Sequence, residues 1–340
     1  MDMTGANANT VGNADLIDFH AHYLAPSLVE RIQRGEFGPH LTATGQPGLV
    51  RFRFPNTTSR PLFSAMPDIQ ERIRHLDECR ITIQVLSTWI DMFGYDLPED
   101  VAATYHTRVN EGLAEAGESC PDRLRFLASV PLPWGDAASD VLKDAVNRLG
   151  AIGSMIGTNV CGTNLDDPGL EPLWAMSEKL DVPVELHPVD VAGADRLGGY
   201  QLANFLGNPF DTTIAASSLI LGGVLDRHPS LSVILVHGGG YLPYACGRLT
   251  HGRRARAVAP NLQREPADYL DRFFYDTVVY DHPTLKALTD IVGIERLVIG
   301  TDYPFDMEPP DVRGMVTDVL GSSSLEVLAD NARRLSGERG

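Results

Sequence analysis

The feature that most constrains the fold is the regular alternation of short apolar runs with helical segments along the 340-residue chain. Eight runs rich in Val, Ile and Leu are predicted as strands. Because they are continuously apolar rather than alternating, we expect strands buried on both faces, as in a parallel sheet. These runs cover residues 16–19, 84–87, 124–130, 152–157, 184–186, 233–236, 274–278 and 297–300.

Helical patterns separate the predicted strands and follow the last one. They cover residues 68–79, 98–119, 137–149, 170–180, 213–225, 284–292 and 312–320, and a helical and loop stretch begins at Tyr241. The simplest closed arrangement is a (β/α)8 TIM barrel, an α/β fold, with residues 312–320 as its closing helix. A doubly wound open sheet is the alternative, although no Gly-rich phosphate motif follows the first strand.

Chain length fits one barrel that carries an insertion. At about 150 residues per domain the chain would hold two domains, but one such barrel takes about 250 residues. We expect a flexible polar leader over residues 1–14 and a single domain over residues 15–340. A small β-containing insertion is expected at about residues 37–67, where residues 50–54 alternate like a hairpin strand.

The charge and cysteine content limit the partners and the compartment. With 28 basic and 45 acidic residues the formal net charge is −17, which argues against nucleic-acid and anionic-membrane partners. The longest apolar stretch, near residues 214–225, is shorter than the ~20 residues that span a bilayer. The four cysteines are scattered without C-x-x-C spacing, so we expect a reducing cytoplasm.

Ionisable residues follow the predicted strands at the end where barrel enzymes keep their chemistry. His20 and His22 end the first strand, and side chains two apart in an extended chain point the same way. His187, His237 and Asp302 follow the fifth, sixth and eighth strands. An isolated H-x-H pair is a weak signal, but five such groups at one rim predict a metal site.

We interpret His20, His22, His187 and Asp302 as ligands of one divalent ion. Imidazole and carboxylate donors suit Zn²⁺ first, with Mn²⁺ or Fe²⁺ as alternatives. His237 is then placed as the acid or base, although Asp302 could instead carry the proton. No lysine follows the fourth strand to bridge two metals, so one ion is expected in each active site.

Several motifs make the chain similar to a known family. They are IDFHAH at 17–22, MFGYD at 92–96, VELHP at 184–188, LILGGV at 219–224, HGGGYLPYACGR at 237–248, RFFYDT at 272–277 and GTDYPF at 300–305. The chain resembles the amidohydrolase superfamily, and within it the metal-dependent decarboxylases of the aminocarboxymuconate-semialdehyde type. This resemblance, over about residues 16–332, implies a (β/α)8 barrel, zinc on the same four ligands, and a catalytic His237.

The resemblance also implies two substrate-binding arginines and a homodimer or a larger homo-oligomer. Arg60 matches an arginine that binds substrate, and Arg248 matches one that reaches the neighbouring subunit's site. A guanidinium pairs bidentately with the carboxylates of a small anionic substrate. A salt-bridge role is the alternative for both residues. Val189 stands where the family commonly has Trp, and residues 306–308 also depart from its pattern, so the exact substrate stays open.

The leading hypothesis is nonoxidative decarboxylation of a small unsaturated or aromatic carboxylate, such as an aminocarboxymuconate semialdehyde or a hydroxybenzoate-like acid. In one route His237 deprotonates a metal-bound water, which adds to the substrate before CO₂ leaves. In another the substrate chelates the metal, and Asp302 or His237 protonates the ring carbon. A hydrolase or hydratase that uses the same activated water is the alternative, and a noncatalytic metal-binding scaffold is a third.

Overall fold

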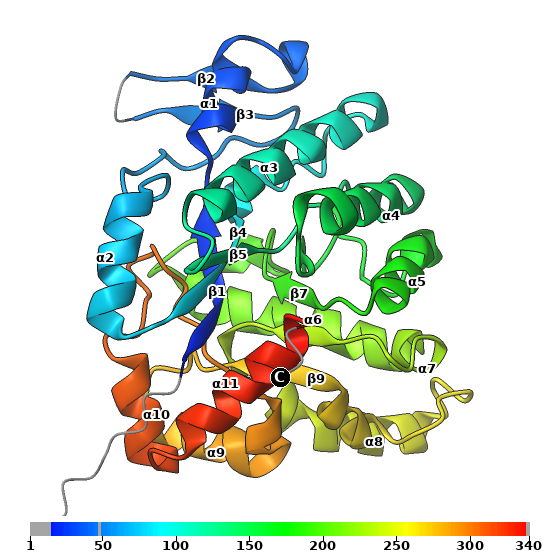
Figure 1. Ribbon diagram of the computed structural model, residues 1–340. Helices are drawn as coiled ribbons and strands as arrows, with labels where there is room; N and C mark the ends of the chain where they lie inside the picture. Colours follow the sequence, from blue (N-terminus) through cyan, green and yellow to red (C-terminus); the bar gives the residue numbers. More distant parts are fainter. Residues whose placement is uncertain (1–14, 47–48, 338–340) are drawn as a thin grey trace, which may run out of the picture.

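Eight parallel strands form the centre of the computed structural model, which describes residues 15–46 and 49–337 (Figure 1). Each strand overlaps one of the predicted strands. They are β1 (Ile17–Tyr23), β4 (Ile83–Thr88), β5 (Leu124–Phe126), β6 (Ser154–Gly157), β7 (Val184–His187), β8 (Val233–Leu235), β9 (Phe273–Asp276) and β10 (Leu297–Val298). The expected leader at residues 1–14 lies outside the described residues.

The strands follow one another around the barrel in chain order. One sheet has the order β1-β4-β5 and the other the order β10-β9-β8-β7-β6. Parallel bridges join the two sheets at both seams, between Asp18 and Ile299 and between Ala128 and Ser154. At the first seam the amide of Phe19 donates to the carbonyl of Ile299 at 2.9 Å. This order is that of a (β/α)8 barrel, so the predicted fold class is confirmed over the open sheet.

Helices surround the strands and cover their outer side (Figure 1). They are α1 (Pro26–Gln33), α2 (Ile69–Cys79), α3 (Glu99–Ser119), α4 (Gly135–Asp144), α5 (Glu171–Leu180), α6 (Asn208–Leu221), α7 (Val224–Arg227), α8 (Leu242–Arg256), α9 (His282–Val292), α10 (Val312–Leu320) and α11 (Ser324–Leu335). None of these described helices is long and apolar enough to cross a membrane.

Residues 312–320 form a helix as predicted, α10, but it does not close the fold, because α11 follows it and packs on β1 and β10. The buried side chains of α11 include Leu325, Leu328 and Leu335. Their spacing places them on one side of a helix, and the other side carries charged residues. The amphipathic pattern of α11 can be read from the sequence. The prediction lacks both α11 and the short helix α1.

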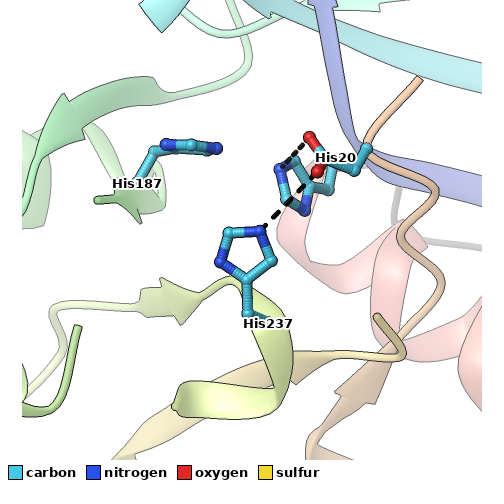
Figure 2. A group of neighbouring side chains, drawn as sticks. His20, His187 and His237 are labelled. Atoms are coloured by element: carbon cyan, nitrogen blue, oxygen red, sulfur yellow. Dashed lines mark ion pairs between the residues drawn. The ribbon is translucent and has the colours of Figure 1, made fainter. Parts of the chain in front are cut away.

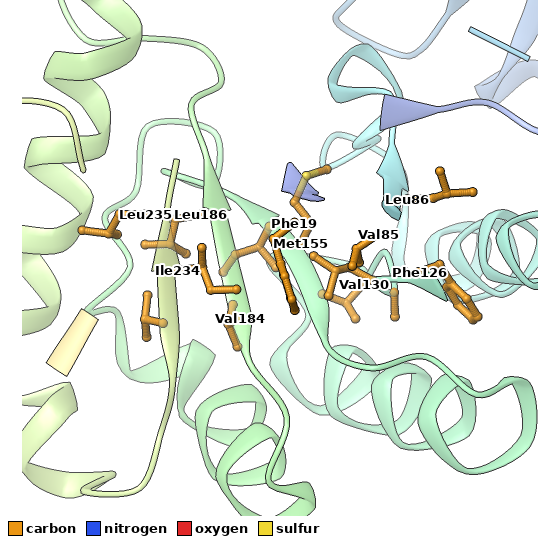
Figure 3. Packing of buried hydrophobic residues seen from close by; sticks show 14 of the residues in the cluster. Phe19, Val85, Leu86, Phe126, Val130, Met155, Val184, Leu186, Ile234 and Leu235 are labelled. Carbon is orange, nitrogen blue, oxygen red and sulfur yellow. The ribbon is translucent and has the colours of Figure 1, made fainter. Parts of the chain in front are cut away.

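The core explains why the strands are continuously apolar. Ile234 and Leu235 are neighbours on β8, so their side chains point to opposite faces, and both are fully buried (Figure 3). Val85 and Leu86 on β4 behave in the same way. One face of each strand fills the barrel and the other packs under the helices. Polar side chains that enter this interior therefore need partners within it.

A two-stranded hairpin lies within the expected insertion. β2 (Thr42–Thr44) pairs antiparallel with β3 (Arg51–Arg53), and Phe52 of β3 is fully buried. The hairpin lies beside α1, away from the barrel strands (Figure 1). The division of the chain into a leader, one domain and an insertion at residues 37–67 stays a prediction.

Arg72 of α2 links β1 to β4, the first two strands of the barrel. Its guanidinium is fully buried and donates to the side-chain oxygen of Gln84 at 2.6 Å and to the carbonyl of His22 at 2.5 Å. Gln84 in turn donates to Asp18 at 2.6 Å. Burial lowers the pKa of Arg72 to about 10 and raises that of Asp18 to about 6. The network therefore fixes the backbone of β1, which carries the predicted ligands His20 and His22, against α2 and β4.

Replacing Arg72 tests this network. We expect Arg72→Met to lower the free energy of unfolding by about 3 kcal/mol, because it leaves buried acceptors without their donor. Urea denaturation measures the change, and Arg74→Met on the exposed side of the same helix is the matched control. An effect no larger than that of the control would show that the network contributes little to stability.

Candidate metal centre

Two of the predicted ligands lie on β1 and face the same way. His20 and His22 are both fully buried, and their rings lie 5.3 Å apart, nearly perpendicular to each other. The two-residue repeat of an extended strand places them on one face, as the H-x-H spacing predicts. The neighbouring strand β10 ends beside them, since the amide of Asp302 donates to the carbonyl of His20 at 2.8 Å.

The remaining predicted residues stand where strands end in tight turns. His187 is the last residue of β7, and His237 follows β8 with a φ of 55°. Gly238 comes next with a φ of 60°, and a Cβ there would lie 2.5 Å from Val279. The glycine therefore lets the chain turn sharply against β9. Asp302 also has a positive φ, 63°, where the chain leaves β10.

All five predicted residues meet at one place. His20, His187, His237 and Asp302 each offer an atom within 4.8 Å of the others. One oxygen of Asp302 lies 3.2 Å from Nε2 of His22 and 3.3 Å from Nε2 of His20. The other lies 3.7 Å from Nε2 of His237. Figure 2 shows the rings of His20, His187 and His237 facing a common space from three separate elements.

Burial and charge shift the protonation of the cluster in different directions. Burial lowers the pKa of His187 well below its usual value, helped by the neighbouring imidazoles, and burial also lowers the pKa of His22. Burial opposes the ionisation of Asp302, but His20 outweighs it and holds that pKa well below its usual range. His20 shows the reverse, because the carboxylates of Asp302 and Asp276 outweigh burial and raise its pKa.

The unpaired atoms of the cluster fit a metal ion. Nε2 of His187 is buried and has no hydrogen-bond partner, and Nε2 of His20 is buried with only an oxygen of Asp302, 3.3 Å away, beside it. Their other nitrogens are occupied, since Nδ1 of His187 lies 3.0 Å from the carbonyl of Pro188 and Nδ1 of His20 lies 2.6 Å from Asp276. A divalent cation held by imidazole and carboxylate would satisfy both atoms. His237 lies in the same cluster as the ligand candidates, so proximity alone does not divide their roles.

The sequence interpretation missed Asp276, which orients His20 from the end of β9. Both side chains are fully buried, and Asp276 also accepts from the amides of Gly238 at 2.8 Å and Val278 at 3.1 Å. A carboxylate on the far nitrogen of a ligand histidine fixes its tautomer and ring direction. The available signal was the aspartate inside the seventh predicted strand, within RFFYDT.

Two hollows open beside the cluster. A cavity of about 240 Å³ is bordered by His237 and Asp302 and otherwise walled largely by apolar and aromatic side chains, among them Val278, Tyr244 and Leu288. A wider cleft of about 900 Å³ contains Arg60, Asp91, Val189 and Asp190. The linings of both include Asn204 and Asn208, so the two hollows adjoin.

The two predicted substrate-binding arginines lie in different surroundings. Arg60 lies in the wider cleft, where its guanidinium is 2.7 Å from Asp91 and 5.2 Å from the ring centre of Phe305. The ring of Phe305 in turn packs on that of His22, with ring centres 5.1 Å apart. The side chain of Phe305 therefore lies between Arg60 and the cluster. Arg248 is exposed on α8 and has no ion pair in the described part of this chain. It lies outside the group that the fold brings together.

The barrel and its His/Asp cluster define an amidohydrolase, and residues 17–335 match that family. The chain belongs to it. It is 35% identical to a 2-amino-3-carboxymuconate-6-semialdehyde decarboxylase of Dictyostelium discoideum, over 94% of this chain and 91% of that one. A gamma-resorcylate decarboxylase of Rhizobium sp. is 31% identical over 67% of this chain and 74% of its own.

A solved structure shares the fold. It is 2,6-dihydroxybenzoate decarboxylase in complex with 2,6-dihydroxybenzoate, with a TM-score of 0.77 and 26% identity, over 95% of this chain and 99% of that one. Together these relatives confirm the family expected from the motifs and the reaction class, a carboxy-lyase of the amidohydrolase superfamily.

Replacing Asp276 tests its hold on His20. We expect Asp276→Asn to weaken metal affinity about 10- to 100-fold, because the ligand ring loses its charged partner. Competition with a chelator measures the affinity, and Asp290→Asn on exposed α9 is the control. Unchanged affinity would mean that His20 is oriented without Asp276 or does not bind the metal.

Proposed function

We propose that this protein removes the carboxylate of a small aromatic or unsaturated acid bound in the cavity beside His237 and Asp302. The observation that carries the proposal is the convergence of three histidines and one aspartate within 4.8 Å at the wall of that cavity. The named substrates of the relatives, an aminocarboxymuconate semialdehyde and dihydroxybenzoates, define the chemical class.

His20, His22, His187 and Asp302 are the proposed ligands of one divalent ion, with zinc as the first choice and manganese or iron as alternatives. The lowered pKa values of His22 and His187 and the ionised carboxylate of Asp302 support this assignment. When bound, such an ion supplies positive charge that stabilises the electron-rich state formed as CO₂ departs.

Proton transfer is the task of the side chains that face the cavity. Breaking the bond to the carboxylate releases CO₂ and leaves its electron pair on the substrate carbon, which must then take up a proton. His237 borders the cavity and lies 3.7 Å from Asp302, so a proton held by either residue can reach that carbon. We assign the transfer to His237, because the low pKa of Asp302 favours a charged ligand.

The walls of the cavity suit a flat, partly apolar ring. Val278, Leu288 and Tyr244 are among the side chains that line the cavity. An apolar wall removes water from the reacting carboxylate and strengthens the attraction of nearby positive charge. A volume of about 240 Å³ limits the substrate to a small molecule.

Arg60 is the proposed anchor for a substrate carboxylate. Its guanidinium is half-exposed and already directed into the cleft by Asp91, with the ring of Phe305 beneath it. A guanidinium can bind an anion while keeping one carboxylate partner, because it offers five N–H donors. It also supplies local positive charge in a protein whose net charge is −17.

The proposed homodimer would cover an exposed apolar surface beside the cavity. Phe205, Tyr241 and Tyr244 border the cavity and are 51%, 37% and 56% exposed, and Phe210 on α6 is 47% exposed. Large exposed apolar patches mark association surfaces. Arg248 stands exposed on the same helix as Tyr244, which suits its proposed reach into a second subunit.

All four cysteines are described and free, which supports the proposed cytoplasmic location.

Metal analysis and turnover of two variants test the site. We expect about one ion per chain in the wild type and none in His187→Ala, which loses a buried ligand. His237→Ala should keep the metal but lose turnover about a hundredfold or more, because it lacks the proton carrier. CO₂ release from a panel of aromatic and unsaturated carboxylates measures turnover, and His282→Ala on exposed α9 is the control.

Three outcomes would contradict the proposal. Two ions per chain would contradict the single-metal site, and full activity in His237→Ala would remove that residue from the reaction. Cleavage or hydration of a substrate without CO₂ would favour the hydrolase or hydratase alternative.

A kinetic comparison tests Arg60. We expect Arg60→Ala to raise KM about tenfold and to change kcat less, because a charge-assisted hydrogen bond to the bound carboxylate is lost. Steady-state kinetics on the best substrate of the panel measure both constants, with Arg53→Ala on the exposed hairpin as the control. An unchanged KM would show that Arg60 does not bind the substrate and that its role is the salt bridge to Asp91.

A further inference from the structure

A second group of potential metal ligands lies on α2, outside the catalytic cluster. His75 and Cys79 are one helical turn apart, and this spacing places two side chains on the same face of a helix. Both are partly buried, so they are neither locked in the core nor fully in solvent.

The third member comes from the loop that follows β10. A carboxylate oxygen of Glu308 lies 2.7 Å from Nε2 of His75, and the sulfur of Cys79 lies 3.5 Å from the same nitrogen. The three ligand atoms lie within 4.8 Å of one another. The sequence separates Glu308 from α2 by more than two hundred residues, so only the closed barrel brings the three together.

The distance between the nitrogen and the sulfur agrees with tetrahedral coordination of a zinc-like ion, whereas the carboxylate of Glu308, now 2.7 Å from Nε2 of His75, would have to move back, because two tetrahedral N and O donors lie about 3.4 Å apart. With Zn–N near 2.0–2.1 Å and Zn–S near 2.3 Å, the two donors of one tetrahedral site lie about 3.6 Å apart. The observed nitrogen–sulfur distance is 3.5 Å. The ring of His75 is also held in place, because it stacks on Tyr303 with centroids 4.3 Å apart. Coordination would therefore need little rearrangement of the imidazole.

The surroundings leave room for a further ligand and carry negative charge. A groove of about 610 Å³ runs past the three residues. Its other charged residues are Glu78, Arg80, Asp311, Arg313 and Asp318. With Glu308, four carboxylates face two guanidinium groups, a balance that favours a cation in the groove. Water or a small ligand could complete the coordination shell.

We propose that His75, Cys79 and Glu308 form a second site for a divalent metal of the zinc class, separate from the ion of the active site. A thiolate among the ligands selects borderline and soft metals over magnesium or calcium. The site ties α2 to the loop that begins at Asp302, since Tyr303 stacks on His75 and Glu308 lies further along the same loop. An ion there would hold this loop against the helix.

Spectroscopic titration of the metal-loaded enzyme separates this site from the first. The proposed ligands of the active site include no sulfur, whereas Cys79 would give a thiolate-to-metal charge-transfer band in the ultraviolet. We expect Cd²⁺ or Co²⁺, added to protein that already holds its active-site ion, to bind as one further equivalent with that band. Cys79→Ser should abolish the band, and Glu308→Gln should weaken the affinity at least tenfold.

Cys120→Ser is the matched control, because Cys120 is another partly buried cysteine, at the end of α3. It should leave the band unchanged. A wild-type titration without a thiolate band would overturn the proposal, and so would a band that survives in Cys79→Ser. If Cys79→Ser fails to fold, unchanged affinity in Glu308→Gln is the deciding contrary result. None of these measurements depends on turnover, so the proposal stands or falls apart from the decarboxylase assignment.

Discussion

The site depends on the pairing of two fully buried groups, Nδ1 of His20 and the carboxylate of Asp276, which lie 2.6 Å apart. Burying a charge is costly unless a partner compensates it, and here each group compensates the other. The pairing also turns Nε2 of His20 toward the common space that His187 and Asp302 face. A metal centre inside a barrel is stable only when its ligands are held by such outer contacts, because unsupported imidazoles would rotate toward other partners.

Closure of the barrel turns residues from distant parts of the sequence into one site. β1 carries two histidines, and its bridge to the end of β10 brings Asp302 beside them. The buried guanidinium of Arg72 fixes the other side of β1 by holding the carbonyl of His22. The same closure places Glu308 against α2, which creates the second group of ligands without any contribution from the catalytic cluster. The same closure of the barrel therefore underlies both proposed metal sites.

The substrate side is built differently from the metal side. The predicted ligands His20, His22 and His187 are buried, whereas the cavity is bordered by aromatic side chains that remain partly exposed, such as Phe205 and Tyr244. Arg60 occupies the cleft with its charge already balanced by Asp91. Under the proposed function, an anionic protein would receive an anionic substrate because attraction is confined to the proposed ion and to a few guanidinium groups such as that of Arg60, while the overall field stays negative.

The sequence by itself determined the strand positions, the barrel class and the five residues that converge, because buried parallel strands leave apolar runs and active-site residues follow their carboxyl ends. It also contained the amphipathic pattern of α11 and the aspartate that ends β9, but local pattern does not reveal which groups a residue contacts. Only the tertiary structure decided that Asp276 orients His20, that Arg60 pairs with Asp91, and that Glu308 reaches His75. The physical reason is that these contacts join elements far apart in the chain, and their partners are selected by the closure of the barrel rather than by local propensity.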